Sequence, residues 1–213
     1  MNFSIKNEFD PLKKVVLGVA DDFGGVPSIE NIYDPHSRKH VLEKTFPEES
    51  QLIFELNEFK NILQKYNIDV LRPRNIKSIN QIFTRDIGFV IDDVFFISNI
   101  IQERKKEIQG VSHIFSSFNK NKIINLPGHV SIEGGDVIVF NNYLFIGTCN
   151  DRDFLTKKVG RTNKAGVDFL KKYFVKKKVF GFDLKKSDTV IKNNCLHLDC
   201  CFQPLGLGHV LVC

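Results

Sequence analysis

Acidic residues and one histidine fall in three short segments whose residue types suit ligand binding and proton transfer. The segments are residues 83–86 (FTRD), 133–136 (EGGD) and 195–202 (CLHLDCCF). Carboxylates accept the N–H donors of a planar cation in pairs, and histidine exchanges protons near neutral pH. Together the segments indicate a site for a cationic planar ligand such as a guanidinium group.

The first two segments also allow simpler explanations. Asp86 follows Arg85 and could be a turn carboxylate paired with that neighbour. Residues 133–136 could form a glycine turn whose acids are solvated. Paired glycines equally let the backbone bend sharply or approach a ligand closely, so a functional role stays open.

The third segment is predicted to be a strand. Side chains alternate along a strand, so Cys195, His197, Asp199 and Cys201 would share one face. Three explanations fit such a face. They are a catalytic acid–base pair, a metal site with thiolate and imidazole ligands, and a core histidine paired with a carboxylate.

Repeated strand and helix patterns must position these segments. The order strand, strand, helix, strand occurs in residues 86–126 and again in residues 136–182. A long loop with room for one helical turn is predicted at 21–48. Helices are predicted at 49–66, 102–118 and 164–173, and strands at 14–19, 68–71, 88–91, 94–97, 122–126, 137–140, 143–147, 178–182, 195–202 and 209–213. No linker separates the repeats, so we predict an α/β fold with one domain over residues 1–213.

Composition excludes several classes of protein. The 213 residues are 42% hydrophobic, enough for a sizeable core, and the net charge of +5 is too mild for a typical nucleic-acid binder. No apolar run approaches the ~20 residues of a spanning helix, and the first 13 residues have no signal-peptide core. We therefore predict a cytoplasmic protein with no membrane or nucleic-acid partner. Its five cysteines are expected to be free thiols, and homo-oligomerisation is left open.

The motifs together resemble a known superfamily. FTRD at 83–86, EGGD at 133–136, RTN at 161–163 and HLDCCF at 197–202 resemble, in order, the amidinotransferase branch of the guanidino-group-modifying enzymes, which include the arginine deiminases. Residues 8–18 resemble the first strand of that family. The resemblance implies a pentein fold, a five-bladed α/β propeller of ββαβ modules, here incomplete at the C-terminus.

The resemblance also implies roles for four catalytic residues. Asp86 would grip the guanidinium group, and Asp199 would hold its other nitrogens. His197 would be the general acid and base, and Glu133 would be the acid beside it. Arg161, helped by Arg104, would bind the carboxylate of the substrate.

The nucleophile is expected beyond the last residue. The family's cysteine lies in a later module, whereas Cys200 and Cys201 belong to the HLDCCF motif and Cys213 does not match the nucleophile's position. The implied reaction transfers an amidino group from arginine or a related compound to an amine through a cysteine thiouronium intermediate, with no metal or organic cofactor. This chain alone is expected to be inactive.

Other functions stay open. They are a hydrolase of the arginine deiminase or dimethylargininase type, a non-catalytic arginine-binding remnant, and a zinc protein built on Cys195, His197 and Cys201.

Overall fold

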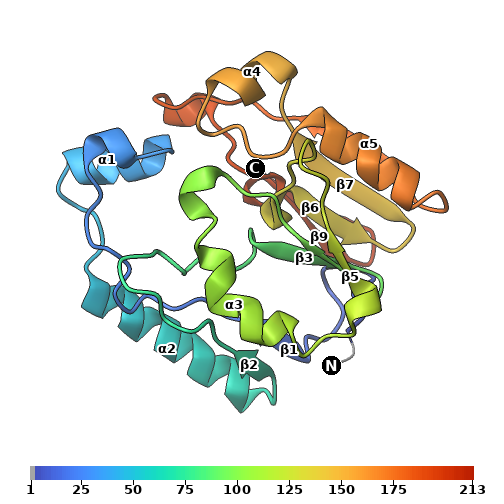
Figure 1. Cartoon of the computed structure of the whole chain (residues 1–213), viewed down its shortest axis with the longest axis horizontal. Helices are drawn as coiled ribbons and strands as arrows, with labels where there is room; N and C mark the ends of the chain where they lie inside the picture. Colours follow the sequence, from blue (N-terminus) through green and yellow to red (C-terminus); the bar gives the residue numbers. More distant parts are fainter. Residues whose placement is uncertain (1–2) are drawn as a thin grey trace.

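Two three-stranded sheets with the same connectivity are the largest sheets of the described structure, and their strands can be followed in Figure 1. The computed structural model describes residues 3–213. The first sheet contains β3 (Gly88–Ile91), β4 (Val94–Ile97) and β5 (Ile123–Asn125), and the second contains β6 (Val137–Phe140), β7 (Tyr143–Thr148) and β8 (Lys178–Asp183). In each sheet the first two strands form an antiparallel hairpin and the third joins the second in parallel. The predicted strand–strand–helix–strand repeat is confirmed in these two modules.

Helices make the crossovers that parallel strands require. α3 (Glu107–Phe115) connects β4 to β5, and α4 (Asp151–Thr156) and α5 (Lys164–Tyr173) connect β7 to β8. α5 begins where the Asn163 side chain accepts the Gly166 N–H, and it buries Val167 and Leu170 against the sheets. Aliphatic and aromatic side chains from both modules pack into one core. This core holds β3 and β6 in place, and the turns before these strands contribute to the site.

Two further pairs of strands complete the described fold. β1 (Lys14–Val16) and β2 (Asp69–Leu71) are parallel and connected through α2 (Glu49–Lys65), whereas β9 (Phe202–Gly206) and β10 (His209–Val212) form an antiparallel hairpin. Figure 1 shows α2 and α5 on opposite sides of the molecule. The five-bladed propeller stays a prediction, because the four sheets comprise two full modules and two strand pairs.

Both predicted hairpin turns are confirmed. Asp92 and Asn141 adopt φ values of 52° and 53° in the two-residue connections of β3–β4 and β6–β7. Asp and Asn tolerate this left-handed region better than other side chains, which is why these residue types gave a usable signal.

The predicted strand at residues 195–202 is wrong. The chain instead makes a 3-10 turn, η6 (Leu198–Cys200), and β9 begins at Phe202. The reason is that side chains satisfy this backbone in place of a neighbouring strand. Asp136 Oδ1 accepts the Leu198 N–H at 3.0 Å, and Lys186 Nζ donates to the carbonyls of Cys195 and Leu196 at 2.9 and 2.7 Å. The shared-face argument for Cys195, His197, Asp199 and Cys201 therefore fails.

Smaller differences concern helix and strand ends. The helix predicted at 102–118 is a 3-10 turn, η2 (Gln102–Arg104), followed by the shorter α3. The predicted loop at 21–48 contains η1 (Ile29–Asn31) and α1 (Pro35–Leu42), which Asp34 caps by accepting the Ser37 N–H with Pro35 at the first position. The first strand ends at Val16 instead of residue 19. Within residues 3–213 no helix is long and apolar enough to cross a membrane.

Candidate active site

Three turns, each preceding the first strand of a sheet, meet at one buried point. Asp86 precedes β3, Glu133 precedes η4 (Gly134–Asp136) and β6, and His197 precedes η6 and β9. One ligand atom from each of these three residues lies within 4.8 Å of the others, and all three side chains are buried. Turns that each precede a first strand therefore bring residues far apart in sequence to one cluster.

The glycines of EGGD allow this convergence. The Gly134 N–H donates to the Asp86 carbonyl at 3.2 Å. A Cβ atom on Gly135 would lie 2.8 Å from His197 Cγ and 2.9 Å from Asp86 Oδ1, closer than real Cβ contacts allow. Glu133 and Asp136 are fully buried, so the explanation of a glycine turn with solvated acids is wrong.

His197 and Glu133 form the shortest contact among these three residues. His197 Nε2 lies 2.8 Å from Glu133 Oε2. Glu133 has a pKa lowered to about 2, so it is ionised and can only accept; Nε2 is therefore the donor. Burial opposes the charged form of His197, but the Glu133 hydrogen bond and the charges of Asp136, Asp86 and Glu133 prevail and raise the pKa of His197. The second ring nitrogen, Nδ1, faces Asp86 Oδ1 at 3.7 Å.

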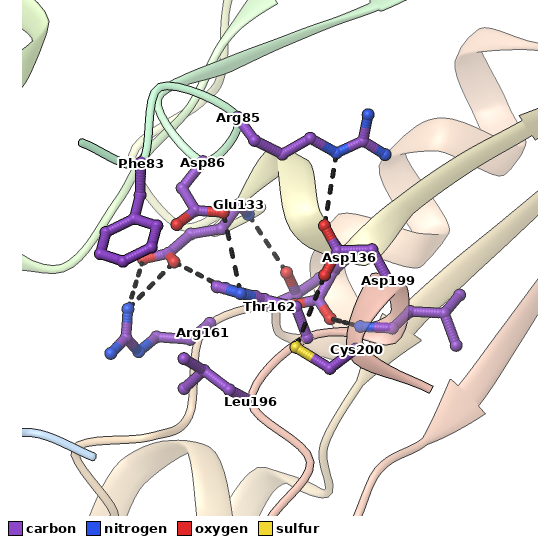
Figure 2. Close-up of polar contacts among 12 residues, drawn as sticks. Phe83, Arg85, Asp86, Glu133, Asp136, Arg161, Thr162, Leu196, Asp199 and Cys200 are labelled. Atoms are coloured by element: carbon purple, nitrogen blue, oxygen red, sulfur yellow. Dashed lines mark hydrogen bonds and ion pairs between the residues drawn. The ribbon is translucent and has the colours of Figure 1, made fainter. Parts of the chain in front are cut away.

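Arg161 is the other main partner of Glu133 (Figure 2). Its Nη1 atom lies 3.0 Å from Glu133 Oε2. Burial by itself raises the pKa of Glu133, but the His197 hydrogen bond and the charges of Arg161, His197 and Arg104 lower it further than burial raises it. Arg161 also stacks over Tyr33, with 5.5 Å to the ring centroid, and its buried Nε has no hydrogen-bond partner in the described structure. Its expected role on a substrate carboxylate stays a prediction.

Arg104 fixes Asp86 instead of facing solvent. Its Nη1 donates to Asp86 Oδ2 at 2.7 Å, while Nε and Nη2 bind both oxygens of Glu107 at 2.7 and 2.8 Å. The guanidinium is buried, and its pKa is raised because the contacts with Glu107, Asp86 and Glu133 outweigh desolvation. The simpler explanation, in which Asp86 pairs with Arg85, is wrong. Sequence reasoning missed Glu107, although its position three residues after Arg104 was the available signal.

Asp199 lies at the edge of the cluster. Its Oδ2 atom is 3.4 Å from Arg85 Nε, and Arg85 also contacts Glu8 at 3.3 Å. Figure 2 draws the contact between Asp199 and Arg85. Burial raises the pKa of Asp199, and the charge of Asp86 raises it further. The charges of Arg85 and His197 lower it, but the net shift is upward. The structure therefore brings Asp199 within electrostatic reach of His197 and Asp86, but pairs it with a half-exposed arginine.

Two buried residues outside the predicted site hold the His197 loop. Asp136 accepts the Leu198 N–H, and burial raises its pKa. Lys186 binds the carbonyls of Cys195 and Leu196. Asp136 could have been found from the sequence, because it belongs to the EGGD motif. Lys186 could not, because the spacing of residues in the sequence does not show which distant backbone groups a long side chain will reach.

A metal ion would compete with existing contacts here. Asp86, Glu133 and His197 have the spacing of a three-ligand set, but Arg104 and Arg161 already neutralise the two carboxylates. The zinc set of Cys195, His197 and Cys201 does not fit either, since the His197 ring faces Glu133 while Cys195 Sγ contacts Cys201 Sγ at 3.4 Å. The two carboxylates already bind guanidinium groups, those of Arg104 and Arg161.

No protein-family model matches the chain. The uncharacterized protein YkgA of Bacillus subtilis (strain 168) is 24% identical over 210 residues, which cover 97% of this chain and 64% of YkgA. This chain therefore spans less than two thirds of that relative.

Solved structures are similar over nearly the whole chain. SxtG, an amidinotransferase of the saxitoxin pathway from Microseira wollei, has a TM-score of 0.73 at 16% identity, covering 98% of this chain and 68% of that one. The N-terminal domain of ArgZ, a cyanobacterial arginine dihydrolase, was solved as a cysteine-to-serine mutant bound to substrate. Its TM-score is 0.70 at 18% identity, and the match covers 93% of this chain and 66% of that one. A Pseudomonas aeruginosa DDAH mutant complexed with citrulline has a TM-score of 0.67 at 14% identity, and the match covers 94% of this chain and 69% of that one. At these identities the likeness establishes the fold.

Proposed function

We propose that this chain, which has the fold of the pentein amidinotransferase and dimethylargininase superfamily, carries the guanidinium-binding and proton-transfer part of a guanidino-group-modifying enzyme. One observation carries the proposal. Asp86, Glu133 and His197 come from three separate turns and meet in a buried cluster with two arginines. A fold needs no such concentration of charge for stability, because burying charged groups is costly.

His197 is the proton-transfer group in this proposal. Its raised pKa favours the imidazolium form, which can protonate a departing amine and then, once neutral, accept a proton from the next nucleophile. Nε2 is engaged with Glu133, so the nitrogen proposed for transfer is Nδ1, which faces Asp86 Oδ1 at 3.7 Å. Glu133 stays ionised and holds the ring in this orientation.

Asp86 and Asp199 are the proposed guanidinium acceptors. Arg104 binds Asp86 through Oδ2, which leaves Oδ1 on the side of His197. The Asp199–Arg85 pair is long and half-exposed, and such pairs contribute little, so a substrate guanidinium can replace Arg85. Arg161 and Arg104, proposed from the sequence as carboxylate binders, hold Glu133 and Asp86 in this state.

The nucleophile of the proposed reaction is a cysteine outside these 213 residues. Burial raises the pKa values of Cys149, Cys195 and Cys200 to about 11, 12 and 11, which disfavours their thiolates. Cys201 contacts Cys195, and Cys213 is exposed just past β10. A covalent route is supported by one relative, since an ArgZ variant is described as covalently bonded to a reaction intermediate.

Transfer to an amine is the favoured reaction, because amidinotransferases from Microseira wollei and Streptomyces griseus are among the structures of the same fold. Hydrolysis is the alternative, as in the named activities of DDAH and ArgZ. A non-catalytic arginine-binding protein is consistent with the high thiol pKa values. A cytoplasmic location and one domain over residues 1–213 stay predictions, and homo-oligomerisation stays open.

Calorimetry with arginine tests the proposal. Arginine should bind, and ornithine, which lacks the guanidinium group, should not. Asp86→Asn should weaken arginine binding roughly 10- to 100-fold, as expected for a lost charge-assisted hydrogen bond of ~1.5–3 kcal/mol. The matched control is Asp93→Asn, because Asp93 is an exposed carboxylate of the β3–β4 turn paired with Lys122. Equal affinities for arginine and ornithine would remove the guanidinium assignment.

A further inference from the structure

The loop that carries His197 and Asp199 begins and ends at a thiol. Cys195 Sγ and Cys201 Sγ lie 3.4 Å apart, and both cysteines are free and half-buried. A disulfide bond is about 2.04 Å long, so the sulfurs must approach by roughly 1.4 Å to bond. Small side-chain rotations can supply a movement of this size.

We propose that Cys195 and Cys201 are a redox-modification site, at which a reversible disulfide closes the loop around His197 and Asp199. This inference rests on the geometry of the thiols and does not depend on the proposed function.

The surrounding contacts hold both cysteines in place before oxidation. The Cys195 N–H donates to the Lys185 carbonyl at 2.9 Å, and its own carbonyl accepts from Lys186 Nζ. The Cys201 N–H donates to the Leu198 carbonyl at 3.0 Å, and the Cys201 carbonyl accepts the Cys213 N–H at 3.0 Å. With the backbone fixed at both ends, closing the ring requires little further ordering.

The remaining cysteines have different neighbours. Cys149 is buried and contacts the Thr162 carbonyl. Cys200 Sγ points to Asp199 Oδ1, a contact drawn in Figure 2, and the two atoms are 3.6 Å apart. Cys213 is exposed after the end of β10. Cys195 and Cys201 are therefore the pair that the structure selects.

The reaction is a thiol–disulfide exchange with a low-molecular-weight disulfide such as oxidised glutathione. The Cys201 thiolate attacks one glutathione sulfur, which forms a mixed disulfide and releases one glutathione thiolate. Cys195 then loses its proton and attacks the Cys201 sulfur, which releases the second glutathione. Two protein thiols are oxidised, one glutathione disulfide is reduced, and the two protons end on the two released glutathiones. Cys195 is unsuited to the first step, since burial raises its pKa to about 12 and leaves it little thiolate, whereas in the second step the Cys201 sulfur already lies beside it.

Oxidation should be felt at His197. The Cys195 thiol donates to the His197 carbonyl at 3.0 Å, and a disulfide sulfur has no proton to donate. The His197 ring lies directly against Gly135 and has no free space on that side. A movement of the two sulfurs is therefore expected to shift the ring relative to Glu133.

Peptide mapping under non-reducing conditions tests the proposal on the full chain, after equilibration with glutathione buffers of increasing oxidised fraction. Trypsin leaves residues 193–213 as one fragment with four cysteines, because Lys192 is the last basic residue that trypsin recognises. Cleavage before Asp199 separates Cys195 from the others. We expect the two halves to stay linked until a reductant is added, in wild type and in Cys200→Ser, but not in Cys201→Ser or Cys195→Ser. The His197 imidazole resonances should shift on oxidation in wild type and Cys200→Ser only.

Three results would overturn the proposal. They are a link that survives Cys201→Ser, a link that requires Cys200, and a wild-type chain that stays reduced in fully oxidised glutathione. Unchanged His197 resonances in a chain shown to be linked would refute the coupling to the site. None of these results depends on arginine binding, so the redox inference and the proposed function fail separately.

Discussion

Gly135→Ala is the sharpest test of how the cluster is built. The added Cβ would lie 2.8 Å from His197 Cγ and 2.9 Å from Asp86 Oδ1, so the histidine ring or the carboxylate must move. Both groups are buried and held, His197 by Glu133 and Asp86 by Arg104. Overpacking of this kind destabilises proteins by about 1–3 kcal/mol, and we expect a loss in that range.

Gly128→Ala is the matched control. Nothing lies within 4 Å of a Cβ atom built on Gly128. Replacing glycine also restricts the unfolded chain, which is worth about 0.4–1 kcal/mol where the native backbone tolerates alanine. Because this contribution acts at both positions, the difference between the variants reports crowding alone.

Urea denaturation of both variants measures the free energy of unfolding, and histidine NMR reports whether the His197 ring has moved. Gly135→Ala should be less stable than Gly128→Ala and should have shifted His197 resonances. Equal stability with unchanged resonances would refute the close approach of the EGGD turn to His197.

The remaining predictions concern charge and turnover. Glu133→Gln should lower the pKa of His197 and cost about 3–5 kcal/mol in unfolding free energy, because Arg161 loses its buried partner; NMR titration and urea denaturation measure the two effects. The pKa of Glu133 is depressed from 4.5 to about 2, so its contribution of roughly 3 kcal/mol to the unfolding free energy should be lost as pH falls through that window. If the unfolding free energy of wild type fell no more steeply below pH ~4.5 than that of Glu133→Gln, this would be contradicted. The pKa of His197 is raised, so its stabilisation is present below pH ~6.5 and lost as pH rises through the folded value; His197→Gln should remove that decline from the pH dependence of stability. The chain alone should release no ornithine, citrulline, urea or ammonia from arginine, and activity that disappears in Cys201→Ala would place the nucleophile within the chain.

The sequence predicted structure correctly where neighbouring residues alone determine the backbone conformation. The hairpin turns at Asp92 and Asn141 and the helices α2 and α5 follow from turn chemistry and hydrophobic spacing. The convergence of Asp86, Glu133 and His197 was indicated by the motifs taken together, although the strand predicted around His197 was wrong.

Sequence reasoning failed where distant side chains determine the backbone. Residues 195–202 alternate as a strand would, but Asp136 and Lys186 bind their backbone groups and produce a turn. The same cause hid the pairing of Arg104 with Asp86 across 18 positions, while the adjacent Arg85 reaches Asp199 instead. Long-range ion pairs of this kind leave no periodic signal.

The most direct test of the central claim is the response of His197 to a guanidino ligand. The chain, with isotope-labelled histidine, is titrated with arginine and, separately, with ornithine, while the His197 imidazole resonances are followed by NMR. If the cluster is a guanidinium site, arginine shifts these resonances saturably and ornithine does not. In Asp86→Asn the midpoint of the arginine titration should move to a roughly 10- to 100-fold higher concentration. Resonances that stay unchanged at saturating arginine, or that respond equally to ornithine, would contradict the assignment of this cluster.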